Sequence, residues 1–246
     1  MAEPLRMARV PLDGAALVEV ARRRGLPTRE LDLGYTAHCA LTELFGELAP
    51  RPFSLQPTTG RWQPVLGYTT ADAKALRARA ELGADPWLFE RVVDWAELAT
   101  KPMPSAWSAG QRLGFRVETV PVGRAAKAHA HHREGAEVDV FLLRCREAGE
   151  GVRVDREEVY RDWLTGQLAR HGGARVTELR VEAYKRERFT RRTQGEGRRS
   201  HLSERPRVTF RGALEVTDPA GFDALLRRGV GRHRAFGLGM LLLSAG

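Results

Sequence analysis

The chain has 246 residues, which suits one large domain or two domains of roughly 100 residues each. Its 40 Lys and Arg against 31 Asp and Glu give a formal net charge of +9, which favours a polyanion such as nucleic acid as its partner. Only two cysteines occur, which excludes a disulfide framework and a four-cysteine zinc site. Since the sequence offers neither a secretory leader nor an apolar run near the roughly 18 residues of a membrane span, we expect a cytoplasmic protein with no membrane segment.

The first part of the chain alternates between strand and helix patterns. Residues 7–12 predict a short strand, and apolar residues at helical spacing predict helices over 15–24 and 33–48. The proline-rich stretch 49–67 is typical of a loop with short extended pieces. An alanine-rich helix is predicted over 71–82. This order is typical of a mixed α+β domain.

Two further strands are predicted over 113–120 and 138–143, before the glycine pair of segment 149–151. That segment is the best candidate for a domain boundary, so we expect an N-terminal domain over 1–148 and a C-terminal domain over 149–246. Each half offers short strands and amphipathic helices. The predicted fold is therefore α+β, with tandem ferredoxin-like (βαββαβ) domains.

The second half ends with strand, helix, glycine-rich loop and strand. Residues 207–216 alternate like a strand, and Asp218-Pro219 is typical of a helix start. Glycine permits positive φ and close backbone approach, and arginines held between glycines can bind phosphate. The candidate RNA-binding residues here are Gly229, Gly231, Arg232, Arg234, Gly237 and Gly239. A dinucleotide-binding fold would place its glycines after a strand and before a helix, so that reading is excluded.

A basic hairpin is predicted on either side of the glycine-containing segment 195–197. Residues 184–211 hold ten bases and three acids, so the window carries +7 of the chain's +9. Aromatic residues are sparse there, which fits contact with the phosphates of a duplex better than base stacking; a solvated loop is the alternative. The candidate contact residues are Lys185, Arg186, Arg188, Arg191, Arg192, Arg198 and Arg199.

Tyr35, His38 and Thr42 share one ridge of the predicted helix 33–48, beside its apolar stripe. A histidine can transfer protons near neutral pH, and a tyrosine can orient a phosphate, so Tyr35 and His38 are the candidate catalytic residues for metal-independent RNA cleavage. The alternative for His38 is a partly buried hydrogen-bonding role. The histidine-rich segment 128–132 lacks a recognisable ligand set, so solvation or RNA contact is favoured over a metal site.

Three motifs resemble one family, the CRISPR repeat-processing endoribonucleases of the RAMP superfamily, and within it the CasE branch of type I-E Cascade. The match is densest over 208–244, from V-T-F-R-G-A-L-E-V to F-G-L-G-M-L-L-L-S. Residues 110–117 (G-Q-R-L-G-F-R-V) are similar to a strand of that branch. Residues 33–38 (L-G-Y-T-A-H) are similar to its early helix, where a tyrosine precedes a histidine by three residues.

The resemblance implies RNA bound between the two domains and cleaved at the 3′ base of the repeat stem-loop. It also implies a 2′,3′-cyclic phosphate product, no metal or other cofactor, and an enzyme that stays on the crRNA with other Cascade subunits. Some members carry a lysine five residues after the histidine, where this chain has Glu43. The role of that lysine would fall to Lys127 or an arginine, or be absent. The alternatives are a non-cleaving stem-loop RNA-binding subunit and a backbone-type Cascade subunit that coats RNA.

Overall fold

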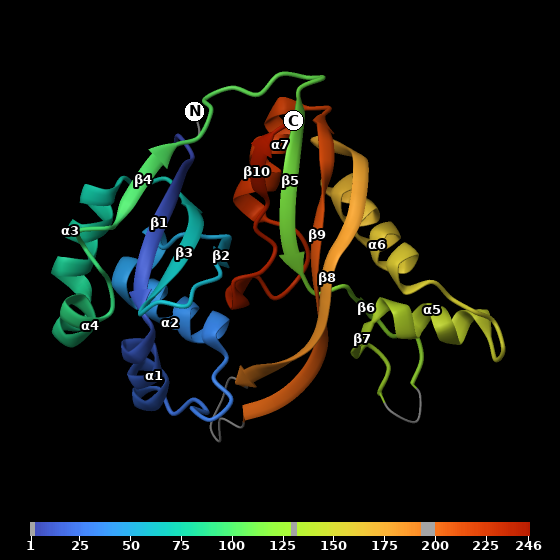
Figure 1. The fold of residues 1–246 in the computed structure, drawn as a ribbon, viewed down its shortest axis with the longest axis horizontal. Coiled ribbons are helices and arrows are strands. Elements are labelled where there is room, and N and C mark those ends of the chain that lie inside the picture. The colour runs from blue at the N-terminus through green and yellow to red at the C-terminus, as the bar shows by residue number, and fades with distance from the viewer. Residues whose placement is uncertain (1–2, 129–131, 193–199) are drawn as a thin grey trace.

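The computed structural model describes residues 3–128, 132–192 and 200–246, with side chains left out of the description at 190–203. Two antiparallel four-stranded sheets stand side by side, with helices α3 and α4 on the outer side of one and α6 on the outer side of the other (Figure 1). No helix in the described residues is long and apolar enough to cross a membrane.

The first unit begins with β1 (Arg6–Asp13) and ends with β4 (Ala99–Pro102). Between them lie α1 (Gly14–Arg23), α2 (Leu33–Phe45), the 3₁₀ helix η1 (Gly46–Leu48), β2 (Phe53–Leu55), β3 (Trp62–Thr69), α3 (Ala73–Gly83) and α4 (Pro86–Arg91). The strand order is β2-β3-β1-β4. This is a βαββαβ unit in which the first and third strands are central, as in a ferredoxin-like fold.

The second unit begins with β5 (Arg112–Thr119) and ends with β10 (Leu242–Ala245). Between them lie β6 (Val122–Arg124), β7 (Glu137–Asp139), α5 (Val140–Ala148), α6 (Arg156–His171), β8 (Ala174–Arg192), β9 (Ser200–Val216), α7 (Pro219–Arg228) and the 3₁₀ helix η2 (Arg234–Phe236). Its sheet order, β10-β5-β9-β8, repeats the pattern of the first unit. The predicted α+β fold with tandem ferredoxin-like units is confirmed.

The chain passes from the first sheet to the second between β4 and β5, at residues 103–111. The boundary predicted at 148 and 149 instead lies between α5 and α6, inside the second βαββαβ unit. The glycine pair that suggested it serves as a turn, because Gly149 and Gly151 both adopt positive φ. The second sheet draws its first strand from well before that turn, which a composition shift does not reveal.

Two local predictions are wrong. The strand expected over 138–143 is the end of β7 followed by α5, because the Asp139 carboxylate accepts the Phe141 N–H at 2.9 Å and caps the helix. The stretch 49–67, expected to be loop with short extended pieces, contributes most of the eight-residue β3, which lies between β1 and β2. Pro11 and Pro64 face each other in register, so the missing N–H groups of both prolines fall at one step of the ladder.

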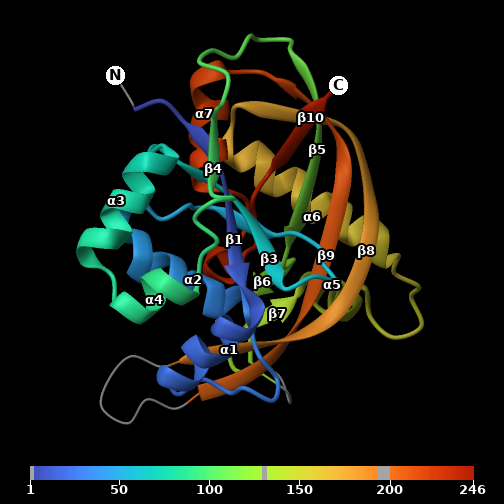
Figure 2. The ribbon, with the colours of Figure 1, turned by 60° about the vertical axis from the view of Figure 1, so that its left-hand side comes forward.

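The two units share buried apolar contacts. Tyr68 of β3 belongs to the core of the second unit, and its hydroxyl donates to the Leu241 carbonyl at 2.8 Å. The β8–β9 hairpin extends to the end of the first unit at which α1 lies (Figures 1 and 2), and there Arg188 pairs with Glu30 at 2.7 Å. The units are therefore docked along one side, with α2 and η2 at the junction.

Candidate active site

Helix α2 carries Tyr35 and His38 on the side away from its buried face. The Asp32 side chain accepts the Tyr35 N–H at 2.9 Å, which satisfies a free donor of the first turn and fixes where the helix begins. Ala37, Leu41 and Leu44 are fully buried in the first core. Tyr35 and His38 are half-buried, and their ring centroids are 6.1 Å apart. The helical spacing read from the sequence thus brings both rings to one ridge.

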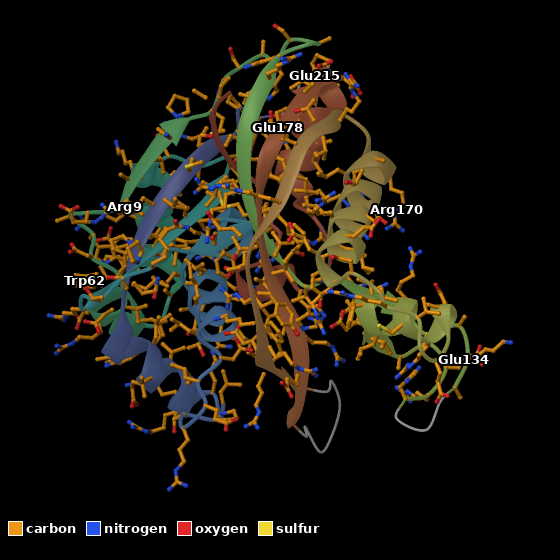
Figure 3. All side chains as sticks on the ribbon, turned by 45° about the vertical axis from the view of Figure 1, so that its right-hand side comes forward. Arg9, Trp62, Glu134, Arg170, Glu178 and Glu215 are labelled. Carbon is orange, nitrogen blue, oxygen red and sulfur yellow. The ribbon has the colours of Figure 1, made fainter. Side chains whose placement is uncertain are left out.

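Gly34 lets the second unit approach this ridge closely. A Cβ at position 34 would lie 2.1 Å from the Phe236 carbonyl oxygen, so only glycine fits against η2 here. The contact brings the Phe236 ring onto Tyr35, stacked with centroids 5.4 Å apart. Arg170 and Glu134 of the second unit lie on the side of the molecule away from this junction (Figure 3).

His38 opens onto a cavity of about 680 Å³ between the two units. That volume is within the range of about 300–1,000 Å³ that is usual for small-ligand sites. Six arginines and one carboxylate stand in its wall, so the cavity is strongly positive. Its lining residues are His38, Arg51, Pro52, Glu137, Phe189, Arg205, Arg227, Arg228, Gly231, Arg232, His233, Arg234, Ala235 and Phe236.

The surroundings of His38 keep its imidazole neutral at pH 7. Burial and the positive charges of Arg51 and Arg24 lower the pKa of His38 from 6.5 to about 4. The Thr42 hydroxyl lies 3.5 Å from His38 Nδ1 and accepts a hydrogen bond from Arg51. Glu43, five residues after His38, is ion-paired with Arg24. In the free protein His38 is therefore in its proton-accepting form.

The glycines of the predicted loop take the conformation that their residue type allows. Gly229, Gly231, Gly237 and Gly239 all have φ between 71° and 80°. Their Cβ positions face protein atoms rather than open space: at Gly239 the Val230 carbonyl oxygen is 2.3 Å away. The glycines shape the loop by packing. The exposed arginines that they hold, Arg232 and Arg234, line the cavity.

His233 stands at the centre of this loop in a left-handed conformation, with φ 61°, unlike any other non-glycine residue of the described chain. Its Nε2 lies 3.0 Å from the Glu137 carboxylate, which also accepts from Arg232 at 2.7 Å. The hydrogen bond from His233 and the pairing with Arg232 lower the pKa of Glu137 to about 2 despite its burial. Glu137 therefore anchors the loop as a carboxylate.

The basic hairpin is less positive in space than in sequence. Arg186 pairs with Glu204, and Lys185 with Glu187. Acids from elsewhere in the chain join them: Glu30 pairs with Arg188, Glu118 with Arg207, and Glu182 with Arg211. Arg191 and Arg192 lie on β8, while Arg198 and Arg199 lie outside the described residues. None of Lys185, Arg186 and Arg188 lines the cavity; they extend along the hairpin instead.

Of the histidine-rich segment, the structure describes Ala128 and His132, and neither lines this cavity. His129 and His131 are outside the described residues, and His132 lies about 3 Å from Arg146. Lys127 is exposed and does not line the cavity. Within residues 3–128, 132–192 and 200–246, no group of three His, Cys, Asp or Glu is placed to hold a metal ion.

A family model described as CRISPR associated protein matches residues 7–245, nearly the whole of the two units. The chain belongs to the CRISPR-associated protein family. A curated relative, the CRISPR-associated endoribonuclease Cse3 of Thermus thermophilus, is 33% identical over 149 residues, which cover 57% of this chain. The matched part is 59% of that relative's length.

Solved structures of this CRISPR-associated family share the fold over nearly their full length. One is CRISPR endoribonuclease Cse3 bound to 19-nucleotide RNA, with 25% identity, a TM-score of 0.62 and coverage of 98% of this chain and 99% of that one. Another is the CRISPR-associated protein Cas6e of Escherichia coli, with 18% identity, a TM-score of 0.57 and the same coverage of both chains. The predicted resemblance to the CasE branch is thereby confirmed.

Three site residues of this family member were not identified from the sequence. Arg51 lies in the proline-rich segment whose composition predicts a loop, and Glu137 precedes the segment 138–143, whose pattern predicts a strand although α5 begins there. Gly34 is one glycine near a helix start. Each acts through a partner distant in sequence, so no local spacing marks it. The helical ridge of Tyr35 and His38 could be found because it is local.

Proposed function

We propose that the protein is a metal-independent endoribonuclease that binds the stem-loop of CRISPR repeat RNA and cleaves at its 3′ base. The observation that carries this proposal is the placement of His38 at the mouth of an arginine-lined cavity between the two units. The relative named Cse3 is an endoribonuclease, and a structure similar in fold is bound to RNA, which supports the same class of substrate here.

His38 supplies the proton acceptor. As the ribose 2′-oxygen bonds to the adjacent phosphorus, its proton passes to the neutral His38 imidazole, and the bond from phosphorus to the 5′-oxygen breaks. The departing 5′-oxygen takes up a proton from water or from the protonated His38 imidazole, and the phosphate remains as a 2′,3′-cyclic ester. The Tyr35 hydroxyl orients the phosphate from the same ridge of α2. No step in this sequence needs a metal.

The arginines of the glycine-rich loop and of the hairpin hold the RNA. Arg232 and Arg234 line the cavity, and the hairpin carries further basic residues along β8. Such contacts fix the backbone of the RNA in register without reading its sequence. A solved CRISPR RNA-guided surveillance complex contains a chain of this fold. We therefore infer that the protein retains the processed RNA and joins the other Cascade subunits, in the cytoplasm.

Incubation of the full chain with the repeat RNA of its own genome in EDTA tests the proposal. We expect cleavage that survives EDTA, and no cleavage of RNA with a 2′-deoxyribose just 5′ of the scissile phosphate. His38→Ala should bind the stem-loop as the wild type does and cleave about 10²- to 10⁴-fold more slowly. Tyr35→Phe should lose less, because only a hydroxyl is removed.

His171→Ala is the matched control, because His171 ends α6 outside the cavity. It should cleave like the wild type. Tight binding without any cleavage would instead support the non-cleaving stem-loop subunit. Cleavage of the deoxy substrate, or undiminished cleavage by His38→Ala, would contradict the mechanism.

A further inference from the structure

Arg51 is the arginine that stands beside His38 in the cavity wall. It lies in the short segment between η1 and β2. Its backbone N–H donates to the Tyr68 carbonyl at 2.7 Å, and the Tyr68 N–H donates to the Pro52 carbonyl at 3.0 Å. These bonds tie the segment to the central strand β3. The base of the Arg51 side chain is therefore held in place by the first sheet, although the residue is exposed.

The same segment is seated against the glycine-rich loop of the second unit. A Cβ on Gly229 would lie 3.0 Å from Pro52 Cβ, and a Cβ on Gly237 would lie 2.9 Å from Phe53 Cε2. Arg51 therefore projects into the cavity at the line where the two units meet. A ligand that reached both His38 and the loop would lie beside it.

The charge of Arg51 is uncompensated within the described part of the chain. Arg24 pairs with Glu43 and Arg232 pairs with Glu137, whereas the described residues place no carboxylate within ion-pair distance of Arg51. Its guanidinium donates to the Thr42 hydroxyl, which uses only one of its five N–H groups. The remaining donors are available to an anion.

We propose that Arg51 is a further catalytic residue, whose guanidinium binds the non-bridging oxygens of the scissile phosphate beside His38. This inference rests on the proposed function. Negative charge accumulates on those oxygens as the 2′-oxygen adds to phosphorus, and a planar guanidinium can donate to two of them at once. The Arg51 guanidinium transfers no proton in this step: it stabilises the developing charge, while the proton passes to His38.

A competing explanation is that Arg51 acts only through His38, by its field or through the Thr42 hydroxyl. Two control variants separate these roles. Arg24→Ala removes a cation that also acts on His38 but does not line the cavity. Thr42→Val removes the hydroxyl between Arg51 and His38 and leaves the guanidinium in the cavity.

The experiment measures single-turnover cleavage of the repeat RNA at saturating protein, with the Kd measured separately and thermal unfolding as a check on folding. Removing one group that stabilises transition-state charge typically slows an enzyme by about 10²- to 10³-fold. We expect a loss of that size in Arg51→Ala, with a Kd change of less than about tenfold. Arg51→Lys should cleave faster than Arg51→Ala but more slowly than the wild type, because lysine keeps the positive charge but lacks the planar guanidinium that can donate to two oxygens at once. Arg24→Ala and Thr42→Val should remain within a few-fold of the wild type.

Sulfur substitution of a non-bridging oxygen of the scissile phosphate provides a readout that a purely structural role would not change. It should slow the wild type and have little further effect on Arg51→Ala, since the group that distinguishes oxygen from sulfur is gone. Equal sulfur effects in the two proteins, or equal losses in Arg51→Ala and Arg24→Ala, would overturn the inference. If the wild type and Arg51→Ala both cleave normally while His38→Ala does not, only this inference fails. An inactive wild type would overturn the proposed function as well.

Discussion

Substitution of Gly34 tests whether close docking of the two units is what assembles the site. A Cβ at this position would lie 2.1 Å from the Phe236 carbonyl oxygen, and real Cβ atoms essentially never approach closer than 3.0 Å. In Gly34→Ala, α2 and η2 must therefore separate by roughly 0.9 Å, the difference between 3.0 and 2.1 Å, or by more. Both elements are backbone at the contact, so no side chain can rotate to relieve it.

The expected loss of activity is larger than the expected loss of stability. Overpacking of this kind costs about 1–3 kcal/mol, and alanine returns up to about 1 kcal/mol of helix propensity. The net loss of unfolding free energy is then about 0–3 kcal/mol, which lowers the Tm by up to about 12 °C in a chain of this size. A displacement of about 1 Å between reacting groups, however, slows a reaction about 10²-fold.

Thermal unfolding and single-turnover cleavage of the repeat RNA, both on the full chain, measure the two effects. Gly166→Ala is the control, because Gly166 lies inside α6 with no atom within 4 Å of its Cβ position. It should raise the free energy of unfolding by up to about 1 kcal/mol and leave cleavage unchanged. Gly34→Ala with wild-type cleavage and wild-type Tm would refute the argument that this contact sets the geometry of the site.

Three further predictions concern charge. The unfolding free energy should rise with pH between about 4 and 6.5, because in that range His38 binds a proton in the unfolded chain but not in the folded one. Chemical denaturation of the wild type and of His38→Asn across that pH range should show a shallower rise in the variant. Arg207 is only 14% exposed, and Arg207→Met leaves the carboxylates of Glu118 and Glu187 without this ion-pair partner. The variant should therefore lose about 3–5 kcal/mol of unfolding free energy, measured by denaturant unfolding. Exposed Arg211→Ala should stay within about 0.5 kcal/mol, and equal losses would contradict this assignment. Replacing Arg191 and Arg192 by alanine should reduce the salt dependence of stem-loop binding by about one unit per lost phosphate contact, and an unchanged slope would mean that these bases are only solvated.

Most elements of the fold could be predicted because their signals are local. The cap at Asp218 and the glycine after α7 mark helix ends directly in the sequence. The strand β3 could not be found, because prolines interrupt its alternation and its place in the sheet depends on pairing with β1. The position of the domain boundary cannot be predicted for the same reason, because strand β5 joins a sheet whose other strands follow much later in the sequence.

The candidate site shows the same division. Tyr35 and His38 lie on one helical ridge, which a periodicity argument can identify, whereas Arg51 reaches His38 only through the tertiary fold. A count of charges along the sequence overestimates the net positive charge of the hairpin, because it cannot include its ion-pair partners Glu30 and Glu118. The catalytic and RNA-binding assignments themselves stay predictions until the variants are measured.

The contact between Gly34 and the Phe236 carbonyl has a consequence for how such a protein can vary in evolution. The two residues lie in different βαββαβ units, at nearly opposite ends of the sequence. Even so, no side chain can be added at Gly34 without displacing the backbone of Phe236. Residues on α2 and on the loop 229–239 are therefore expected to change together among relatives. A chimera that combines the first unit of one relative with the second unit of another could fold in both halves and still lack a working site, unless the two surfaces had been inherited as a pair.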